Sequence, residues 1–224
     1  MIDNILLQSD LYKYSHHSMY PAGTNKIYSY FCSRGSRIAG VDEFVFFGLQ
    51  YYIKQYLMGW ITLEDIYEFE YYIRQTLGDG ALSGKILDDL WELRNLGYLP
   101  LRIRALPEGA RVPIGVPAFT ITNTLPQYYW LPNFVETLLM KVWHPSTCAT
   151  VADRFRSLGK KYSDLTCDDD SHLPYQFHDF SYRGLSSEES GCLSGAAHLL
   201  SHKGSDTMGG IRLLAEYYND GKVV

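Results

Sequence analysis

The segment from residue 175 to residue 218, YQFHDFSYRGLSSEESGCLSGAAHLLSHKGSDTMGGIRLLAEYY, indicates the fold class of this chain. It predicts a strand at 175–180, a helix that begins near Ser186, a short extended piece at 203–207 and a second helix over 208–218. Strand, helix, strand and helix in this order, joined by short loops, are typical of βαβ units and a parallel sheet. We therefore expect an α/β fold.

The helix expected near Ser186 carries two further signals. Ser186 and Glu189 have the S-x-x-E spacing of a capping box, in which side chains satisfy the free backbone N–H groups of the first turn. Small residues that allow a close approach follow at Gly191, Ser194, Gly195, Ala196 and Ala197. This helix is therefore expected to lie close against the sheet.

The first part of the chain alternates between strand and helix patterns. Aromatic and β-forming residues predict a strand at 26–33, and the long apolar run at 43–58 predicts a largely buried helix. Thr62 and Asp65 resemble a capping box at the start of a second helix. The apolar residues of that helix recur at helical spacing at Ile66, Phe69 and Ile73.

A third helix is expected at about 84–96, after which the apolar period changes from helical to alternating. The segments LRIRAL (101–106) and AFTIT (118–122) both alternate, and the breakers Gly115 and Pro117 separate them. This pattern predicts an antiparallel meander.

The pattern becomes helical again from about residue 133. The run NFVETLLMKVW (133–143) is expected to stop before Pro145, and Ser146 is a plausible N-cap for a helix that reaches about residue 162. The acidic stretch CDDDS (167–171) suggests a magnesium site, but adjacent side chains point apart. It is better explained as a solvated turn.

Length, composition and charge exclude several classes of protein. The 224 residues are enough for one large or two modest domains, and 46% of them are apolar. The formal net charge of −5 gives no basic face for binding nucleic acid. The 19 tyrosines leave two interpretations open, half-exposed faces of amphipathic elements or an interface with another subunit.

Cysteine usage and the lack of targeting signals bear on the compartment. The four cysteines have neither zinc-ligand nor CxxC spacing, so we interpret them as free thiols in a reducing compartment. The opening residues MIDNILLQSD lack a basic region ahead of an apolar core, and no apolar run of about 18 residues is present. A soluble, cytoplasmic protein is expected, without membrane partners.

The chemistry of a ring-binding pocket is visible in the segment HDFSYRG. Phe180 and Tyr182 offer aromatic faces for a planar ring, and Arg183 and Asp206 fall at the carboxyl ends of the two predicted strands, where α/β folds place ligands. A guanidinium can donate to the C=O of a primary carboxamide, while a carboxylate accepts from its NH₂. A ligand carboxylate would be repelled by Asp206, so the pair favours an amide.

Two alternative interpretations concern the same residues. Arg183 and Asp206 could instead form a structural ion pair at a loop. His178 and Asp179 suggest a catalytic dyad because they are adjacent, but neighbours in a strand face opposite ways, which weakens that interpretation.

Five separated motifs together resemble the nicotinamide phosphoribosyltransferase family. They are, in chain order, SDLYKYSHHSMYP, YSYFCSR, FFGLQYYI, HDFSYRGLSS and KGSDT. The resemblance runs over essentially all of the chain. It implies transfer of a phosphoribosyl group from 5-phosphoribosyl 1-pyrophosphate to nicotinamide, which forms nicotinamide mononucleotide and pyrophosphate.

The resemblance also implies a domain arrangement. Residues 1–145 would form an α/β domain with antiparallel strands, and residues 146–224 would form the first βα units of the incomplete TIM-like barrel found in type II phosphoribosyltransferases. Family chains are roughly twice as long, and a complete barrel of eight units takes about 250 residues. The remainder of the barrel is therefore expected to be absent from this chain. Family members are homodimers with active sites at the subunit interface.

Matched motif positions imply roles for individual residues. Phe180 and the partner subunit's Tyr12 would enclose the pyridine ring, and Arg183 and Asp206 would hold its carboxamide. Arg34 would help to bind the sugar-phosphate donor. Asp10 and His178 would line the pocket. The family commonly has glycine where this chain has Ser181.

The resemblance identifies no catalytic side chain with certainty. It implies Mg²⁺ bound with the phosphoribosyl donor and a use of ATP through a histidine in the missing half. The chain could be one subunit of a split enzyme whose second chain completes the barrel, or a truncated fragment. Two other functions stay open: nicotinate phosphoribosyltransferase, which Asp206 argues against, and a non-catalytic nicotinamide-binding subunit.

Overall fold

The computed structural model describes residues 4–81 and 84–223, which belong to two compact units that interleave along the chain. The first unit takes in Met1–Phe31, Tyr52–Ala105 and Phe119–Met140, and the second takes in Cys32–Tyr51, Leu106–Ala118 and Lys141–Val224. The domain boundary expected after residue 145 stays a prediction.

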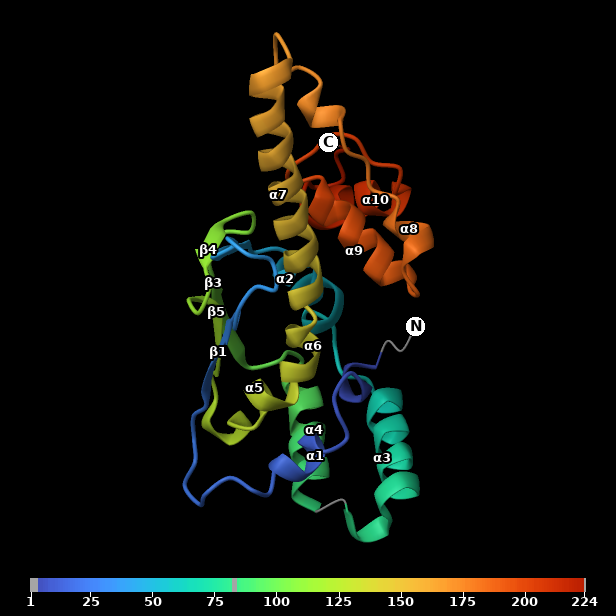
Figure 1. Cartoon of the computed structure of the whole chain (residues 1–224). Helices are drawn as coiled ribbons and strands as arrows, with labels where there is room; N and C mark the ends of the chain where they lie inside the picture. Colours follow the sequence, from blue (N-terminus) through green and yellow to red (C-terminus); the bar gives the residue numbers. More distant parts are fainter. Residues whose placement is uncertain (1–3, 82–83, 224) are drawn as a thin grey trace. The chain divides into compact units, whose positions relative to one another are not determined.

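Helices and strands both contribute, which confirms the α/β class (Figure 1). The strands are β1 (Tyr28–Cys32), β2 (Glu43–Val45), β3 (Leu101–Ala105), β4 (Arg111–Pro113) and β5 (Pro117–Asn123). The helices are α1 (Lys13–His16), α2 (Leu49–Tyr52), α3 (Leu63–Leu77), α4 (Gly84–Leu96), α5 (Leu131–Phe134), α6 (Glu136–Met140), α7 (Trp143–Thr166), α8 (Ser181–Gly184), α9 (Glu188–His198) and α10 (Met208–Tyr217). Short 3₁₀ turns lie at Ile5–Leu7, Asp79–Ala81, Pro126–Tyr128 and Leu173–Tyr175, and a π-helical turn at Ile53–Leu57.

The first unit holds most of a three-stranded sheet in the order β1-β5-β3. β3 and β5 are antiparallel, with Leu101 opposite Asn123 and Ala105 opposite Phe119. The meander prediction is confirmed for these two strands. The intervening strand β4 pairs instead with β2 in a separate two-stranded sheet of the second unit.

The helix α3 forms where the capping box and the apolar spacing in the sequence predicted it. The Thr62 side chain accepts from the backbone N–H of Asp65, and the Asp65 carboxylate accepts from the N–H of Thr62, which completes the capping box. The residues expected on its apolar face, Ile66, Phe69 and Ile73, are all buried. Local capping and periodicity are sufficient to define this element.

The prediction of a helix over residues 43–58 is wrong for the first half of that range. Residues 43–45 form β2, and α2 begins only at Leu49. Gly48 separates the two with φ +105°, in the region that favours glycine, and a Cβ there would lie 2.5 Å from Cγ of Pro145. Because residues 44–49 are all buried, they show neither a period of two nor one of 3.6.

The N-cap predicted at Ser146 is also wrong. α7 begins at Trp143 and includes Pro145 in its first turn, where the missing N–H of proline costs no hydrogen bond. Ser146 is buried, and its hydroxyl bonds to both the N–H (3.1 Å) and the C=O (3.0 Å) of Phe47. The hydroxyl thus satisfies backbone groups at the end of the buried run instead of capping a helix.

The capping box predicted at Ser186 and Glu189 is wrong, because the helix begins one residue later. Ser187 is the N-cap of α9, and its side chain accepts from the N–H of Ser190. The small residues of α9 are buried as expected, but α9 packs on the helices α7 and α10 rather than on a sheet (Figure 1).

The parallel strands expected at 175–180 and 203–207 are not formed among the described residues. Residues 177–180 and 203–206 are irregular backbone segments, and one backbone hydrogen bond joins them, from the N–H of Asp206 to the C=O of Asp179 (3.0 Å). Nε2 of His198 lies 3.1 Å from both the Phe177 and the Gly204 carbonyl, where it donates to both. A side chain therefore takes the place of ladder hydrogen bonds.

Candidate ring-binding site

The candidate site lies in the second unit, where the segment 177–180 enters α8 and the segment 203–207 enters α10. The backbone bond between Asp179 and Asp206 brings the two segments together. Predicted residues His178, Phe180 and Asp206 are therefore gathered at one place. This proximity was expected from a parallel sheet and arises here without strands.

His178 is the side chain that pairs with Asp206. Nδ1 of His178 lies 2.8 Å from Oδ2 of Asp206, and because the carboxylate can only accept, Nδ1 carries the proton. Both side chains are about half exposed, at 42% and 47%. The pairing fixes the orientation of the Asp206 carboxylate.

Gly204 provides the space for this pair. A Cβ at Gly204 would lie 2.5 Å from Nε2 of His178, so a larger residue would displace the ring. The imidazole therefore packs directly on backbone, in a position that keeps it beside Asp206.

Phe180 and Arg183 form the other half of the site. Phe180 precedes α8 and is 54% exposed, which leaves a ring face open to solvent. The Arg183 guanidinium lies 5.8 Å from the centre of that ring, within cation–π range. The alternative of an ion pair between Arg183 and Asp206 is not observed in the described part of the chain, where the Asp206 carboxylate is hydrogen-bonded to His178.

Asp179 is a residue whose connections the sequence did not reveal. Its Oδ1 accepts from the N–H (3.2 Å) and hydroxyl (2.6 Å) of Ser181 and from the hydroxyl of Thr207 (2.5 Å). The dyad of adjacent residues is therefore absent, because His178 pairs with Asp206 and Asp179 turns to Ser181 and Thr207. The available signal was Asp followed by Ser two residues later, a pattern typical of side chain to backbone turns.

Tyr12 and Asp10 belong to the first unit, so their surroundings are described separately. The exposed Tyr12 ring lies edge-on to His16 at 5.1 Å between centroids, and Nζ of Lys13 is 5.3 Å from its centre. Oδ2 of Asp10 accepts from the hydroxyl of Thr137 (2.9 Å). Tyr12 thus offers a supported, exposed aromatic face.

Arg34 lies in the second unit, in the loop after β1, and is exposed. Its expected contact with the sugar-phosphate donor stays a prediction, as do the ligand contacts of the other predicted site residues.

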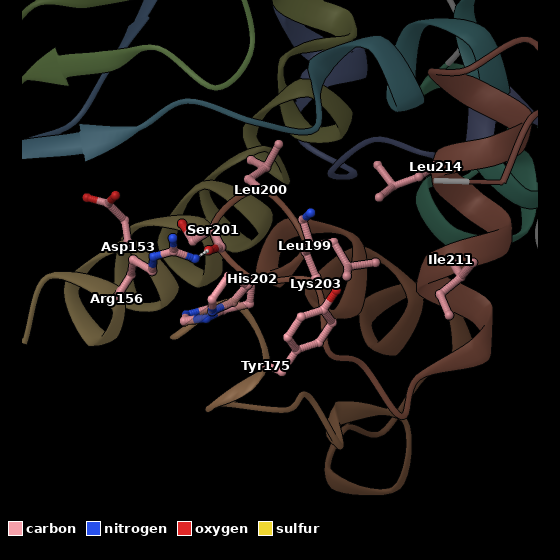
Figure 2. A pocket seen from close by; sticks show the side chains of 11 residues that line it. Asp153, Arg156, Tyr175, Leu199, Leu200, Ser201, His202, Lys203, Ile211 and Leu214 are labelled. Atoms are coloured by element: carbon pink, nitrogen blue, oxygen red, sulfur yellow. Dashed lines mark hydrogen bonds between the residues drawn. The ribbon is translucent and has the colours of Figure 1, made fainter. Parts of the chain in front are cut away.

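A separate cavity of about 810 Å³ lies in the second unit beside α7, α9 and α10 (Figure 2). Figure 2 shows Arg156, Ser201 and His202 at one end and the apolar Ile211 and Leu214 at the other. Its further lining residues are Asp153, Pro174, Tyr175, Leu199, Leu200 and Lys203. None of the predicted ring-binding residues lines it, so the cavity is distinct from the candidate site.

Two side chains that line the cavity donate to backbone carbonyls. Arg156 donates to the C=O of Ser201 (2.9 Å), and Nε2 of the buried His202 donates to the C=O of Ala152 (3.1 Å). Burial lowers the pKa of His202, and the neighbouring His198 and Arg156 lower it further.

Metal ligands do not converge in the part of the chain that the structure describes. Among residues 4–81 and 84–223, no group of three or more His, Cys, Asp or Glu side chains could hold a metal ion. In the acidic stretch, Asp169 accepts from Ser171 and Asp170 from Lys160 and Ser163, and these bonds lower the pKa of both carboxyls. Residues 167–171 are all exposed, which agrees with the predicted solvated turn.

The described helices also include none that is long and apolar enough to cross a membrane.

A solved structure shares the fold of this chain. The crystal structure of human nicotinic acid phosphoribosyltransferase matches with a TM-score of 0.65, over 92% of this chain and 37% of the human chain, at 17% sequence identity. The chain therefore has the α/β fold of a type II phosphoribosyltransferase.

The sequence is similar to that of nicotinamide phosphoribosyltransferases. Residues 4–103 match the model of the nicotinamide phosphoribosyltransferase N-terminal domain. The nicotinamide phosphoribosyltransferase of Acinetobacter baylyi is 37% identical over 99% of this chain, and that of Xanthomonas campestris pv. campestris is 38% identical over 97%. The enzyme of Mycoplasma pneumoniae is 30% identical over 92%. The chain is thus similar to nicotinamide phosphoribosyltransferases over nearly its whole length, and it spans about half the length of these curated relatives (46% of the first two).

Proposed function

We propose that the protein transfers the phosphoribosyl group of 5-phosphoribosyl 1-pyrophosphate to nicotinamide, forming nicotinamide mononucleotide and pyrophosphate for NAD salvage. The observation that carries this proposal is the similarity to enzymes named nicotinamide phosphoribosyltransferase over 97–99% of the chain. That range includes the segments that bear Phe180, Arg183 and Asp206. Because the chain spans 46% of those relatives, we propose that a barrel half equivalent to the rest of them is needed for activity.

The proposed ring pocket uses Phe180 on one face of the pyridine ring and the partner subunit's Tyr12 on the other. Arg183 would donate to the carboxamide C=O, and Asp206 would accept from its NH₂. The bond from His178 to Oδ2 of Asp206 supports this role, because it orients the carboxylate while Oδ1 stays available. Asp10 would line the pocket, and Arg34 would bind the donor.

The reaction itself places few demands on proton transfer. The pyridine nitrogen already carries a lone pair, so no base is required to form the nucleophile. The ribose carbon passes through a cationic state while pyrophosphate leaves with negative charge. Catalysis would therefore come from holding the ring in line and from neutralising the phosphates.

Mg²⁺ is proposed to arrive with the phosphoribosyl donor. This agrees with the preference of Mg²⁺ for substrate phosphates combined with one or two carboxylates. The described residues do not provide a cluster of three ligands, so no step of the reaction is assigned to a metal bound by this chain. A use of ATP would depend on residues of the other barrel half.

The proposed assembly is a homodimer in the cytoplasm, with the barrel completed by a second chain or by further sequence. The exposed Tyr12 ring supports the dimer, because a ring that stacks on a ligand from the partner subunit must be open in the single chain. The tyrosine-rich surface is consistent with a subunit interface.

Nicotinate is the main competing substrate, since the matching human structure is that of a nicotinic acid phosphoribosyltransferase. That likeness concerns the fold alone. The Asp206 carboxylate would repel the carboxylate of nicotinate, which favours nicotinamide. A non-catalytic nicotinamide-binding subunit would keep this pocket without the donor site.

Purification from the native source tests the proposal. Intact mass spectrometry would identify any copurifying chain, and the complex would be assayed for nicotinamide mononucleotide. A copurifying chain of similar size with activity supports a split enzyme. A lone 25.7 kDa species that binds nicotinamide without making product would support the binding subunit instead.

A further inference from the structure

We propose that Asp179 is a positioning residue that sets the separation between the ring-holding turn at Phe180–Arg183 and the carboxamide acceptor Asp206. This inference rests on the proposed function, because it assumes that Phe180 and Asp206 contact one ligand. Asp179 would not touch that ligand. It would act by holding the two segments that do.

Three donor groups meet at one carboxylate oxygen of Asp179. Oδ1 of Asp179 accepts from the Ser181 N–H (3.2 Å), the Ser181 hydroxyl (2.6 Å) and the Thr207 hydroxyl (2.5 Å). Ser181 is the first residue of α8, and Thr207 immediately precedes α10. One side chain therefore joins the starts of two helices that are far apart in sequence.

The backbone of Asp179 also bonds to the segment that contains Asp206 and Thr207. Its C=O accepts from the Asp206 N–H (3.0 Å), and the Thr207 hydroxyl that donates to Oδ1 lies 3.3 Å from the same C=O. Side chain and backbone of one residue thus bind consecutive residues of the opposite segment. This two-point attachment restricts both sliding and rotation of Asp206 relative to Asp179.

The two residues that donate to Asp179, Thr207 and Ser181, are themselves held in place. The Thr207 side chain is fully buried (0% exposed), and the Ser181 hydroxyl also lies 3.1 Å from the C=O of Gly191 in α9. Phe180 lies between Asp179 and Ser181 in the chain, so its backbone is held on both sides. These bonds restrict movement of the Phe180 backbone and so help to fix where its ring is placed.

The bonds of Asp179 lie next to the hydrogen-bonded pair of His178 and Asp206. His178 precedes Asp179 and binds the side chain of Asp206, while Asp179 binds the backbone of Asp206. The two bonds close a ring of contacts around the carboxylate. Loss of the Asp179 side chain would leave the His178 bond in place, but would release Thr207 and the start of α8.

A set of substitutions in the protein as it is purified tests this inference. Asp179→Ala removes the shared acceptor, and Thr207→Val and Ser181→Ala each remove one donor. Asp179→Asn keeps an acceptor oxygen of the same shape, and Thr207→Ser keeps the hydroxyl. Asp168→Ala, at an exposed aspartate of the 167–171 loop, is the matched control.

The measurement is the dissociation constant for nicotinamide and for 3-methylpyridine, which has the ring without the carboxamide, together with thermal stability. Asp179→Ala and Thr207→Val are expected to weaken nicotinamide binding about tenfold, on the scale of one lost hydrogen bond to a charged group. Binding of 3-methylpyridine should change less. Thr207→Ser and Asp168→Ala should match the wild type, and Asp179→Asn should fall between.

The outcomes distinguish a failure of the role inferred for Asp179 from a failure of the proposed function. If the variants lose thermal stability while the ratio of the two dissociation constants stays at the wild-type value, Asp179 is only structural and the inference is wrong. If Asp179→Ala does not fold, the same comparison is made with the milder Ser181→Ala and Asp179→Asn variants. If the folded wild type shows no preference for nicotinamide over 3-methylpyridine, the proposed function itself is overturned.

Discussion

Nδ1 of His178 donates a hydrogen bond of 2.8 Å to Oδ2 of Asp206, which is 28 residues further along the chain. The bond occupies one carboxylate oxygen and leaves the other for a ligand. It therefore makes Asp206 an oriented acceptor, and this orientation is the basis on which an amide would be distinguished from an acid.

Replacement of that acceptor gives the first prediction. Asp206→Asn should weaken the use of nicotinamide and relax discrimination against nicotinate, because an amide NH₂ can donate to a ligand carboxylate that Asp206 repels. A bond to a charged group is worth about 1.5–3 kcal/mol, so the ratio of kcat/KM for the two substrates should fall by about 10- to 100-fold. The ratio would be measured on the assembled enzyme, with Asp168→Asn as the control. Unchanged selectivity would rule out this role for Asp206.

The exposed ring of Phe180 gives the second prediction. Phe180→Ala should raise KM for nicotinamide about fivefold, because one stacked aromatic face contributes about 1 kcal/mol. Phe180→Tyr keeps the ring and should stay close to the wild type. Tyr162→Ala, at another exposed aromatic residue of the second unit, should leave KM unchanged. Equal effects at positions 162 and 180 would contradict a stacking role.

The backbone of Gly48 gives a prediction about the fold. Gly48→Ala should destabilise the chain by about 2–4 kcal/mol, because its φ of +105° is strained for alanine and the new Cβ meets Pro145. Gly35→Ala is the matched control, since a Cβ there meets nothing within 4 Å. Urea unfolding of both variants measures the difference. A Gly48→Ala protein as stable as the control would show that β2 and α2 are not joined in this way.

The buried His202 gives a prediction about pH. Its folded pKa is lowered from 6.5 by burial, so the unfolded chain binds a proton first as the pH falls. Stability contributed by neutral His202 is present above about pH 6.5 and is lost as the pH falls from there through the lower folded pKa.

The test compares the wild type with His202→Phe, which keeps an apolar ring in the same space. Urea unfolding between pH 7.5 and pH 5.5 should show a smaller loss of unfolding free energy in the variant. Parallel losses in the two proteins would contradict the lowered pKa.

Local signals in the sequence were sufficient for much of the first unit. The α3 helix follows from a capping box at Thr62 and Asp65 and from apolar residues at helical spacing, all of which act within a few residues of each other. The pairing of β3 with β5 follows from alternation in both segments. Such elements depend little on distant contacts, which is why their positions could be predicted.

The failures lie where distant contacts decide the conformation. The run after residue 43 has no apolar period, and its break at Gly48 depends on contact with Pro145 of α7. Ser146 resembled an N-cap, but its hydroxyl serves the backbone of Phe47. Sequence patterns cannot show which distant backbone group a hydroxyl will satisfy.

For the candidate site, too, some features could be predicted from the sequence and others could not. The chemistry of Phe180, Arg183 and Asp206 could be recognised from residue type and motif, and the structure gathers the segments that carry them. The partner of Asp206 was not predicted, because His178 comes close only through the backbone bond between Asp179 and Asp206. The connections of Asp179 depend on the same fold and were missed for the same reason.

The most direct test of the central claim is the identity of the product formed by the assembled enzyme. The purified complex would be supplied with 5-phosphoribosyl 1-pyrophosphate, Mg²⁺ and equal amounts of nicotinamide and nicotinate, and both mononucleotides would be quantified by mass spectrometry. The account predicts nicotinamide mononucleotide in large excess, with pyrophosphate in equal amount. Formation of nicotinate mononucleotide as the main product, or of neither mononucleotide by a complete complex, would contradict it.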